Sequence, residues 1–108
     1  IYTIGSDRLS KDLHIVNEEV NQKYSRLILD YTFNSEEDPN RFYYRSDHYN
    51  FAVKGIPAIF FFSGVHKDYH QPGDTPDKIM YDKMERIGRH AFYLMWELAD
   101  RKDRIRVN

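Results

Sequence analysis

The sequence predicts an α/β fold in which helices pack on a mostly parallel sheet. Two observations support this prediction. Strand-like and helix-like segments alternate along the 108 residues, and alternation is typical of α/β proteins with parallel sheets. The run Ile56–Phe62 is also apolar throughout, as expected of a strand that is covered on both faces. The length suits one domain.

The first half of the chain is predicted to form a strand, a helix and a second strand. Ile1–Ile4 is a short β-prone run that Gly5 ends. A helix is expected to follow Ser10, a suitable N-cap, and to end near Tyr24 or Ser25. Its apolar residues recur at steps of three and four: Leu9, Leu13, Val16, Val20 and Tyr24. Residues 27–33 are rich in β-branched and aromatic side chains and predict the second strand.

The second half is predicted to contain a short helix that ends at Gly55, the strand Ile56–Phe62, a loop over Ser63–Asp74 and a long helix over Tyr81–Arg101. The long helix has the strongest periodic signal, carried by Met80, Met84, Ile87, Ala91, Leu94, Met95 and Leu98. In open α/β sheets, functional sites form beyond the carboxyl ends of the strands. The loop Ser63–Asp74 is therefore where a site is expected.

Composition excludes several classes of function. The net charge is −1, which gives no basic surface of the kind that attracts nucleic acid. The longest apolar run has seven residues, far too few for a membrane span. No cysteine is present, so any metal must be held by histidine and carboxylates. Nothing in the sequence indicates an oligomeric state.

His70 is the strongest candidate for a chemical role. It lies in a loop that a predicted core strand and a predicted core helix hold at both ends, which suits a metal ligand or an acid–base group. Asp74, four residues later, is placed to accept the second ring N–H, as partners of metal-bound imidazoles do. A loop histidine near an aspartate is also common without any metal, and spacing alone leaves both interpretations open.

Asp47 and His48 form a second acid–histidine pair. With Ser46 they suggest a catalytic triad, but three adjacent residues cannot converge their side chains in the required geometry. Either the pair supports a site or Ser46 or Asp47 caps the short helix. His14 and His90 lie on the two predicted longer helices, where a structural or surface role is expected.

At these positions the sequence resembles the co-catalytic zinc aminopeptidases, a superfamily that includes bacterial leucyl aminopeptidase, glutamate carboxypeptidase and glutaminyl cyclase. The resemblance implies the C-terminal portion of a zinc-exopeptidase (phosphorylase/hydrolase-like) three-layer fold. Four blocks in order carry it: Arg45-Ser46-Asp47-His48 with Phe51, then Gly55–Ala58, then Phe62–Gly64, then Tyr69-His70 with Asp74-Thr75.

The resemblance implies a role for several residues. His70 matches the histidine that binds one of two zinc ions. Tyr69 matches a tyrosine whose hydroxyl stabilises the tetrahedral intermediate, and Arg45 matches an arginine that assists it in some members. Phe62 matches a residue of the apolar pocket for the N-terminal side chain of the peptide substrate. Secretion or a periplasmic location is implied as well.

The other metal ligands of the superfamily have no match in this chain. They are a histidine, a bridging aspartate, a glutamate next to the glutamate base, and a further aspartate, all expected upstream of the matched blocks. We therefore expect residues 1–108 to be the C-terminal part of a zinc aminopeptidase domain, inactive as a separate chain. The alternatives are a glutaminyl cyclase or carboxypeptidase of the same fold, or a non-catalytic domain that binds peptide. Tyr69 favours the aminopeptidase, since similar cyclases have Trp there.

Overall fold

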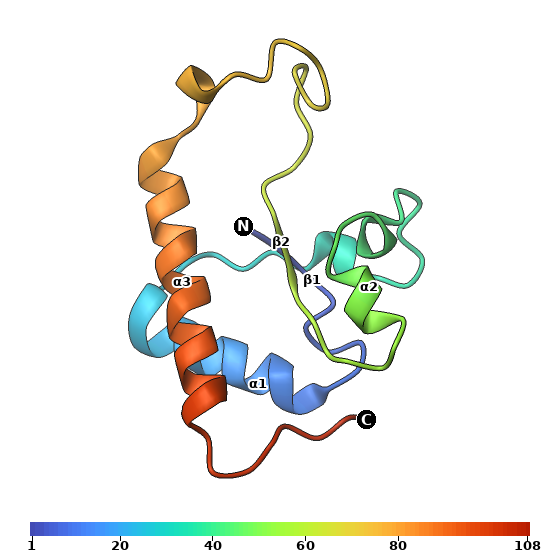
Figure 1. Ribbon diagram of the computed structural model, residues 1–108, viewed down its shortest axis with the longest axis vertical. Coiled ribbons are helices and arrows are strands. Elements are labelled where there is room, and N and C mark those ends of the chain that lie inside the picture. The colour runs from blue at the N-terminus through green and yellow to red at the C-terminus, as the bar shows by residue number, and fades with distance from the viewer.

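The computed structural model describes residues 1–108 and contains both helices and strands (Figure 1). The strands are β1 (Tyr2–Ile4) and β2 (Phe60–Phe62). The α-helices are α1 (Lys11–Val20), α2 (Tyr49–Ala52) and α3 (Tyr81–Asp100). Between them lie one π-helical turn, η1 (Asn21–Ser25), and three 3-10 turns, η2 (Thr32–Asn34), η3 (Phe42–Tyr44) and η4 (Pro76–Lys78). The α/β class is confirmed.

The sheet corrects the prediction of a mostly parallel arrangement. Strands β1 and β2 pair antiparallel, with Ile4 opposite Phe60, and the only parallel pairing is a single bridge between Tyr2 and Asp30. Alternation of strands and helices favours a parallel sheet when neighbouring strands extend fully. The predicted strand over residues 27–33 does not, because the Asp30 carboxylate accepts the N–H of Thr32 at 2.9 Å and turns the chain into η2.

Both predicted longer helices are confirmed, with one change. Ser10 caps α1 by accepting the Leu13 N–H at 3.2 Å, and α3 ends one residue before the predicted position. Helix α1 does not continue regularly to Tyr24. It widens into η1, because Asn21 exchanges side-chain hydrogen bonds with the backbone of Leu27 and fixes the turn there.

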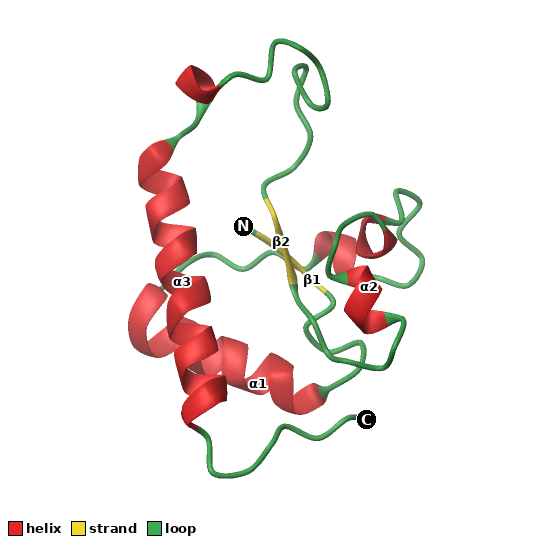
Figure 2. Cartoon of the chain, in the orientation of Figure 1, coloured by secondary structure: helices red, strands yellow, loops and turns green.

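The buried side chains form two clusters, one on each side of β2. The first packs against one face of the sheet and contains Ile4, Phe42, Tyr43, Ala52 and Phe62. The second joins α1 to α3 through Val16, Val20 and Leu94. Figure 2 shows α3 crossing α1 on one side of the strands, with α2 on the other. No helix is both long enough and apolar enough to cross a membrane.

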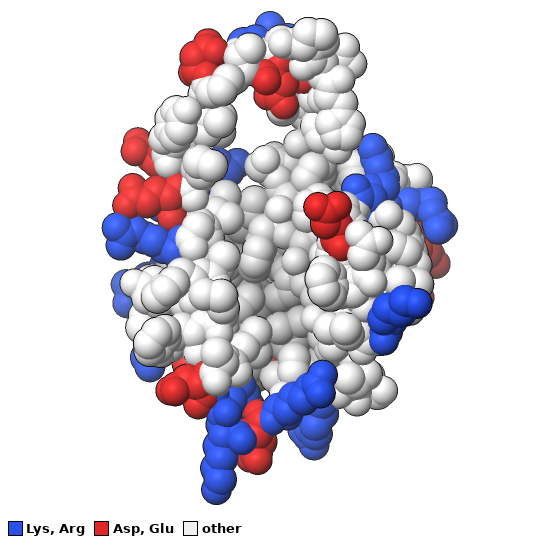
Figure 3. Space-filling model, in the orientation of Figure 1, with Lys and Arg blue, Asp and Glu red and all other residues white.

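The predicted strand Ile56–Phe62 is reduced to β2, Phe60–Phe62, and it is not covered on both faces, which corrects the second prediction. Phe62 is buried, whereas Ile59 and Phe61 line an open groove against α3. No element of this chain lies over that groove. The uncharged surface continues along α3 (Figure 3), where several large apolar side chains are exposed: Met84, Phe92, Met95 and Trp96.

Candidate functional site

The predicted site loop leaves the end of β2 and arches away from the body of the molecule before α3 begins (Figure 1). Successive turns shape it. The Tyr69 N–H donates to the His66 carbonyl at 3.0 Å, and the Gln71 N–H donates to the Asp68 carbonyl at 2.9 Å. These local bonds form the turns that carry Tyr69 and His70.

His70 has an unusual backbone conformation and an available side chain. Its φ is +55°, in the left-handed region that residues other than glycine seldom adopt. The imidazole stacks on the Tyr69 ring with 4.0 Å between centroids and 16° between planes. The side-chain hydrogen bonds of this loop involve His66, Asp68 and Lys78, not His70. His70 is exposed, and its imidazole makes no hydrogen bond within the chain.

The partner predicted for His70 does not contact it here. Asp74 is exposed, and no hydrogen bond joins its carboxylate to the imidazole. The loop carboxylate that does form an ion pair is Asp68, with Lys78 at 3.2 Å. That Asp74 orients His70 remains a prediction.

Arg45 and Phe62 contact residues other than those of the His70 loop. The Arg45 guanidinium donates to the Asn40 carbonyl at 3.3 Å and lies 4.9 Å from the centre of the Phe42 ring. Phe62 packs in the first core cluster, with its ring 4.6 Å from that of Phe42. Within this chain, the side chains of Arg45 and Phe62 therefore pack around η3. The catalytic role of Arg45 and the pocket role of Phe62 stay predictions.

The His48 imidazole packs against aromatic rings. Its ring stacks on Phe60 at 5.0 Å and meets the edge of Tyr43 at 5.5 Å. Both ring nitrogens are buried without a hydrogen-bond partner, and burial lowers the pKa of His48. No hydrogen bond links it to the exposed Asp47, and neither Ser46 nor Asp47 caps α2, which begins directly after His48 without a side-chain cap.

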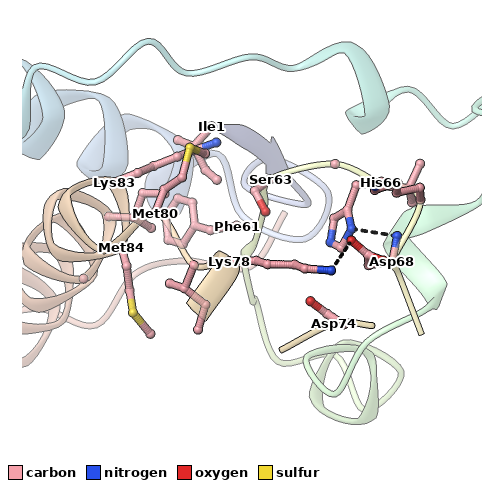
Figure 4. Close-up of a pocket in the computed structure, with 16 residues that line it drawn as sticks. Ile1, Phe61, Ser63, His66, Asp68, Asp74, Lys78, Met80, Lys83 and Met84 are labelled. Atoms are coloured by element: carbon pink, nitrogen blue, oxygen red, sulfur yellow. Dashed lines mark hydrogen bonds and ion pairs between the residues drawn. The ribbon is translucent and has the colours of Figure 1, made fainter. Parts of the chain in front are cut away.

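A pocket of about 800 Å³ lies between this loop, the end of β2 and the start of α3 (Figure 4). One side is polar, with His66, Asp68, Asp74 and Lys78, and the other is apolar, with Phe61, Met80 and Met84. Sequence reasoning missed Phe61 and Lys78. The register of β1 with β2 decides that Phe61, and not Phe62, faces this side, and a run of three phenylalanines contains no signal for that choice.

The residues of this chain do not form a metal site by themselves. No three histidine, aspartate or glutamate side chains lie close enough to hold an ion. Catalytic zinc sites use three protein ligands, and the ligand predicted in this chain, His70, is a single imidazole. The loop fits the role of carrying one zinc ligand. The side chains of residues 1–108 alone do not provide the three ligands that a zinc site needs.

The comparison with protein-family models defines the class of this chain as a metallopeptidase, a hydrolase. The chain belongs to peptidase family M28, whose model matches residues 4–95 and so covers the site loop and most of α3. Family M28 comprises the zinc aminopeptidases, carboxypeptidases and glutaminyl cyclases, which confirms the resemblance. Members are generally zinc-dependent. Searches of curated proteins and of solved structures each returned no significant match.

Proposed function

We propose that this chain forms one side of the active site of a zinc aminopeptidase that releases N-terminal residues from peptides. The observation that supports this most strongly is the exposed, left-handed His70 on the loop after β2, in a chain that belongs to family M28.

In this proposal His70 is one ligand of a zinc ion. The metal supplies Lewis acidity toward the peptide carbonyl and a more acidic bound water. Tyr69 stacks directly on His70, so both rings belong to the same side of the proposed site. A phenol in that position donates a hydrogen bond to the oxygen on which negative charge develops during hydrolysis.

The remaining ligands and the glutamate base are proposed to come from polypeptide outside residues 1–108. Two observations support this. The chain holds no set of three possible ligands, and the apolar groove of Ile59 and Phe61 against α3 is open. Exposed apolar surface of this extent is typical of an interface. We propose that the polypeptide that completes the site also covers this groove, and that residues 1–108 alone are inactive.

The test uses the intact enzyme, meaning residues 1–108 together with the rest of an M28 peptidase domain. Hydrolysis of amino-acid nitroanilides and bound zinc are measured for His70→Ala and for Gln71→Ala, the adjacent exposed loop residue. We expect His70→Ala to abolish activity and lower zinc content, and Gln71→Ala to retain both. Full activity in His70→Ala would show that this loop has another role.

Substrate variants separate the aminopeptidase from its alternatives. An aminopeptidase hydrolyses leucine nitroanilide and rejects the N-acetylated form, because it recognises the free amino group. A carboxypeptidase instead cleaves N-blocked peptides with a free carboxyl end. A cyclase releases ammonia from peptides that begin with glutamine.

A further inference from the structure

Lys78 makes two contacts that bracket His70 in the sequence. Its Nζ atom donates to Asp68 Oδ2 at 3.2 Å and to the Gly73 carbonyl at 2.7 Å. Figure 4 shows the Lys78 side chain reaching across the pocket to Asp68. Asp68 precedes His70 by two residues and Gly73 follows it by three. One ammonium group therefore holds both ends of the turn that carries His70.

Gly73 lets these groups come together. A Cβ atom added at this position would lie 2.7 Å from Asp68 Oδ1, closer than real Cβ contacts allow. The backbone of Asp68 is fixed as well, since its N–H donates to His66 Nδ1 at 3.2 Å and its carbonyl accepts the Gln71 N–H at 2.9 Å. A side chain at position 73 would therefore require the Asp68 carboxylate, which pairs with Lys78, to shift.

His70, which lies between Asp68 and Gly73, needs the support of these contacts. A histidine with φ near +55° occupies a conformation that persists only where the surrounding structure imposes it. The imidazole of His70 has no hydrogen bond in this loop to hold it. Besides the backbone bond from the Gln71 N–H to the Asp68 carbonyl, the contacts of Lys78 are the side-chain interactions that span the turn.

We propose that Lys78, Asp68 and Gly73 form a clasp that holds His70 in the left-handed conformation in which its imidazole is presented. These three are positioning residues: they act through the backbone of the turn and do not touch substrate. The importance of the clasp for catalysis rests on the proposed function, whereas the conformation that it holds does not.

The expected size of the effect is moderate. The side chains of Lys78 and Asp68 are 46% and 20% exposed, and solvent-exposed ion pairs contribute little. The second bond, to the Gly73 carbonyl, is short and charge-assisted, which strengthens the clasp. Loss of the ammonium should therefore open the turn about three- to tenfold more often without unfolding the chain.

The test uses the 108-residue chain without metal. Trypsin cleavage after Lys67, next to Asp68, measures opening of the loop, and NMR relaxation and coupling constants of His70 report its backbone order and φ. We expect Lys78→Met to raise the cleavage rate about three- to tenfold and to average the His70 coupling constant. Lys83→Met, a change at another lysine of the same pocket, should alter neither, and Lys78→Arg should restore order.

A second pair of variants tests the clasp from its other end. Gly73→Ala should loosen the same turn, whereas Gly88→Ala, where an added Cβ meets nothing within 4 Å, should leave the loop unchanged. An unchanged His70 coupling constant in both Lys78→Met and Gly73→Ala would overturn the proposal, whatever the activity of the intact enzyme. Circular dichroism shows whether Lys78→Met or Gly73→Ala has unfolded. If one of them has, the His70 coupling constant of the other variant decides whether the proposal holds.

Discussion

Nε2 of His90 lies 2.8 Å from Oδ1 of Asn17, in the fully buried contact between α3 and α1. Since the amide oxygen only accepts, Nε2 carries the proton, and the neutral ring then accepts the Ser25 hydroxyl at Nδ1, also at 2.8 Å. The edge of the ring meets Phe61 at 5.3 Å. His90 thus joins α1, η1, β2 and α3, and its role is structural, as its position on a predicted helix indicated.

Replacing His90 should lower stability. His90→Ala leaves a cavity and removes the partners of Asn17 and Ser25, so we expect the free energy of unfolding to fall by about 2–4 kcal/mol. Urea denaturation at neutral pH measures it. Arg86→Ala, at an exposed position of the same helix, is the control and should lie within about 0.5 kcal/mol of the parent chain.

The same residue should make stability depend on pH. Burial lowers the pKa of His90, against a weaker opposing effect of the Glu18 carboxylate. The unfolded chain therefore binds this proton more readily, so the contribution is complete above the ordinary pKa of about 6.5 and is lost as the pH falls below it. His48, whose pKa burial also lowers, acts in the same direction. His90→Gln should reduce the slope of stability against pH between about pH 7.5 and 5.5, and an unchanged slope would contradict this.

Two glycines with positive φ should respond differently to alanine. Gly5 has φ +91°, and an added Cβ would lie 2.6 Å from the Tyr43 ring and 3.0 Å from the Ala58 carbonyl. Gly55 has φ +79° with nothing within 4 Å. We expect Gly5→Ala to cost about 2–4 kcal/mol and Gly55→Ala only the backbone strain of about 1 kcal/mol. Equal losses in urea denaturation would show that the contact with Tyr43 relaxes freely.

Trp96 reports whether the apolar surface of α3 is covered. It is the only tryptophan of the chain and is 63% exposed. Acrylamide should quench its fluorescence readily in the isolated chain. The polypeptide proposed to cover the groove reaches Met95, the neighbour of Trp96. If it extends over Trp96 in the intact enzyme, the share of emission that Trp96→Phe removes should resist quenching. Equal quenching in both forms would show that the completing polypeptide does not cover Trp96.

Tyr69→Phe tests the proposed oxyanion donor. Removal of the hydroxyl should lower kcat of the intact enzyme by about 10²-fold and leave zinc content unchanged, since the ring still stacks on His70. Tyr44→Phe, at an exposed tyrosine of η3, should have no effect. Unchanged turnover in Tyr69→Phe would remove this residue from the chemistry.

The parts of the fold with local signals were predictable. Ser10 capped its helix as expected, and the apolar period of residues 80–98 located α3. Elements that depend on a particular side chain were not. The Asp30 carboxylate ended a strand-like run at Thr32, and Asn21 turned the end of α1 into η1.

The shape of the candidate site loop was predictable in outline but not in detail. The position after an apolar strand located the His70 loop, whereas no local pattern indicated the contact of Lys78 with Asp68 ten residues earlier. Which phenylalanine faces the pocket depends on strand register, with Phe62 opposite Tyr2. The resemblance to M28 peptidases supplied the expected role of His70, which spacing alone left open.

Zinc binding by the 108-residue chain tests the central claim, that His70 is one ligand of a site that this chain does not complete. Calorimetric titration with zinc and hydrolysis of leucine nitroanilide are measured for the chain and for the intact enzyme. We predict neither tight zinc binding nor turnover by the chain, and both in the intact enzyme, where His70→Ala removes them. Tight zinc binding with turnover by residues 1–108 alone would contradict the claim.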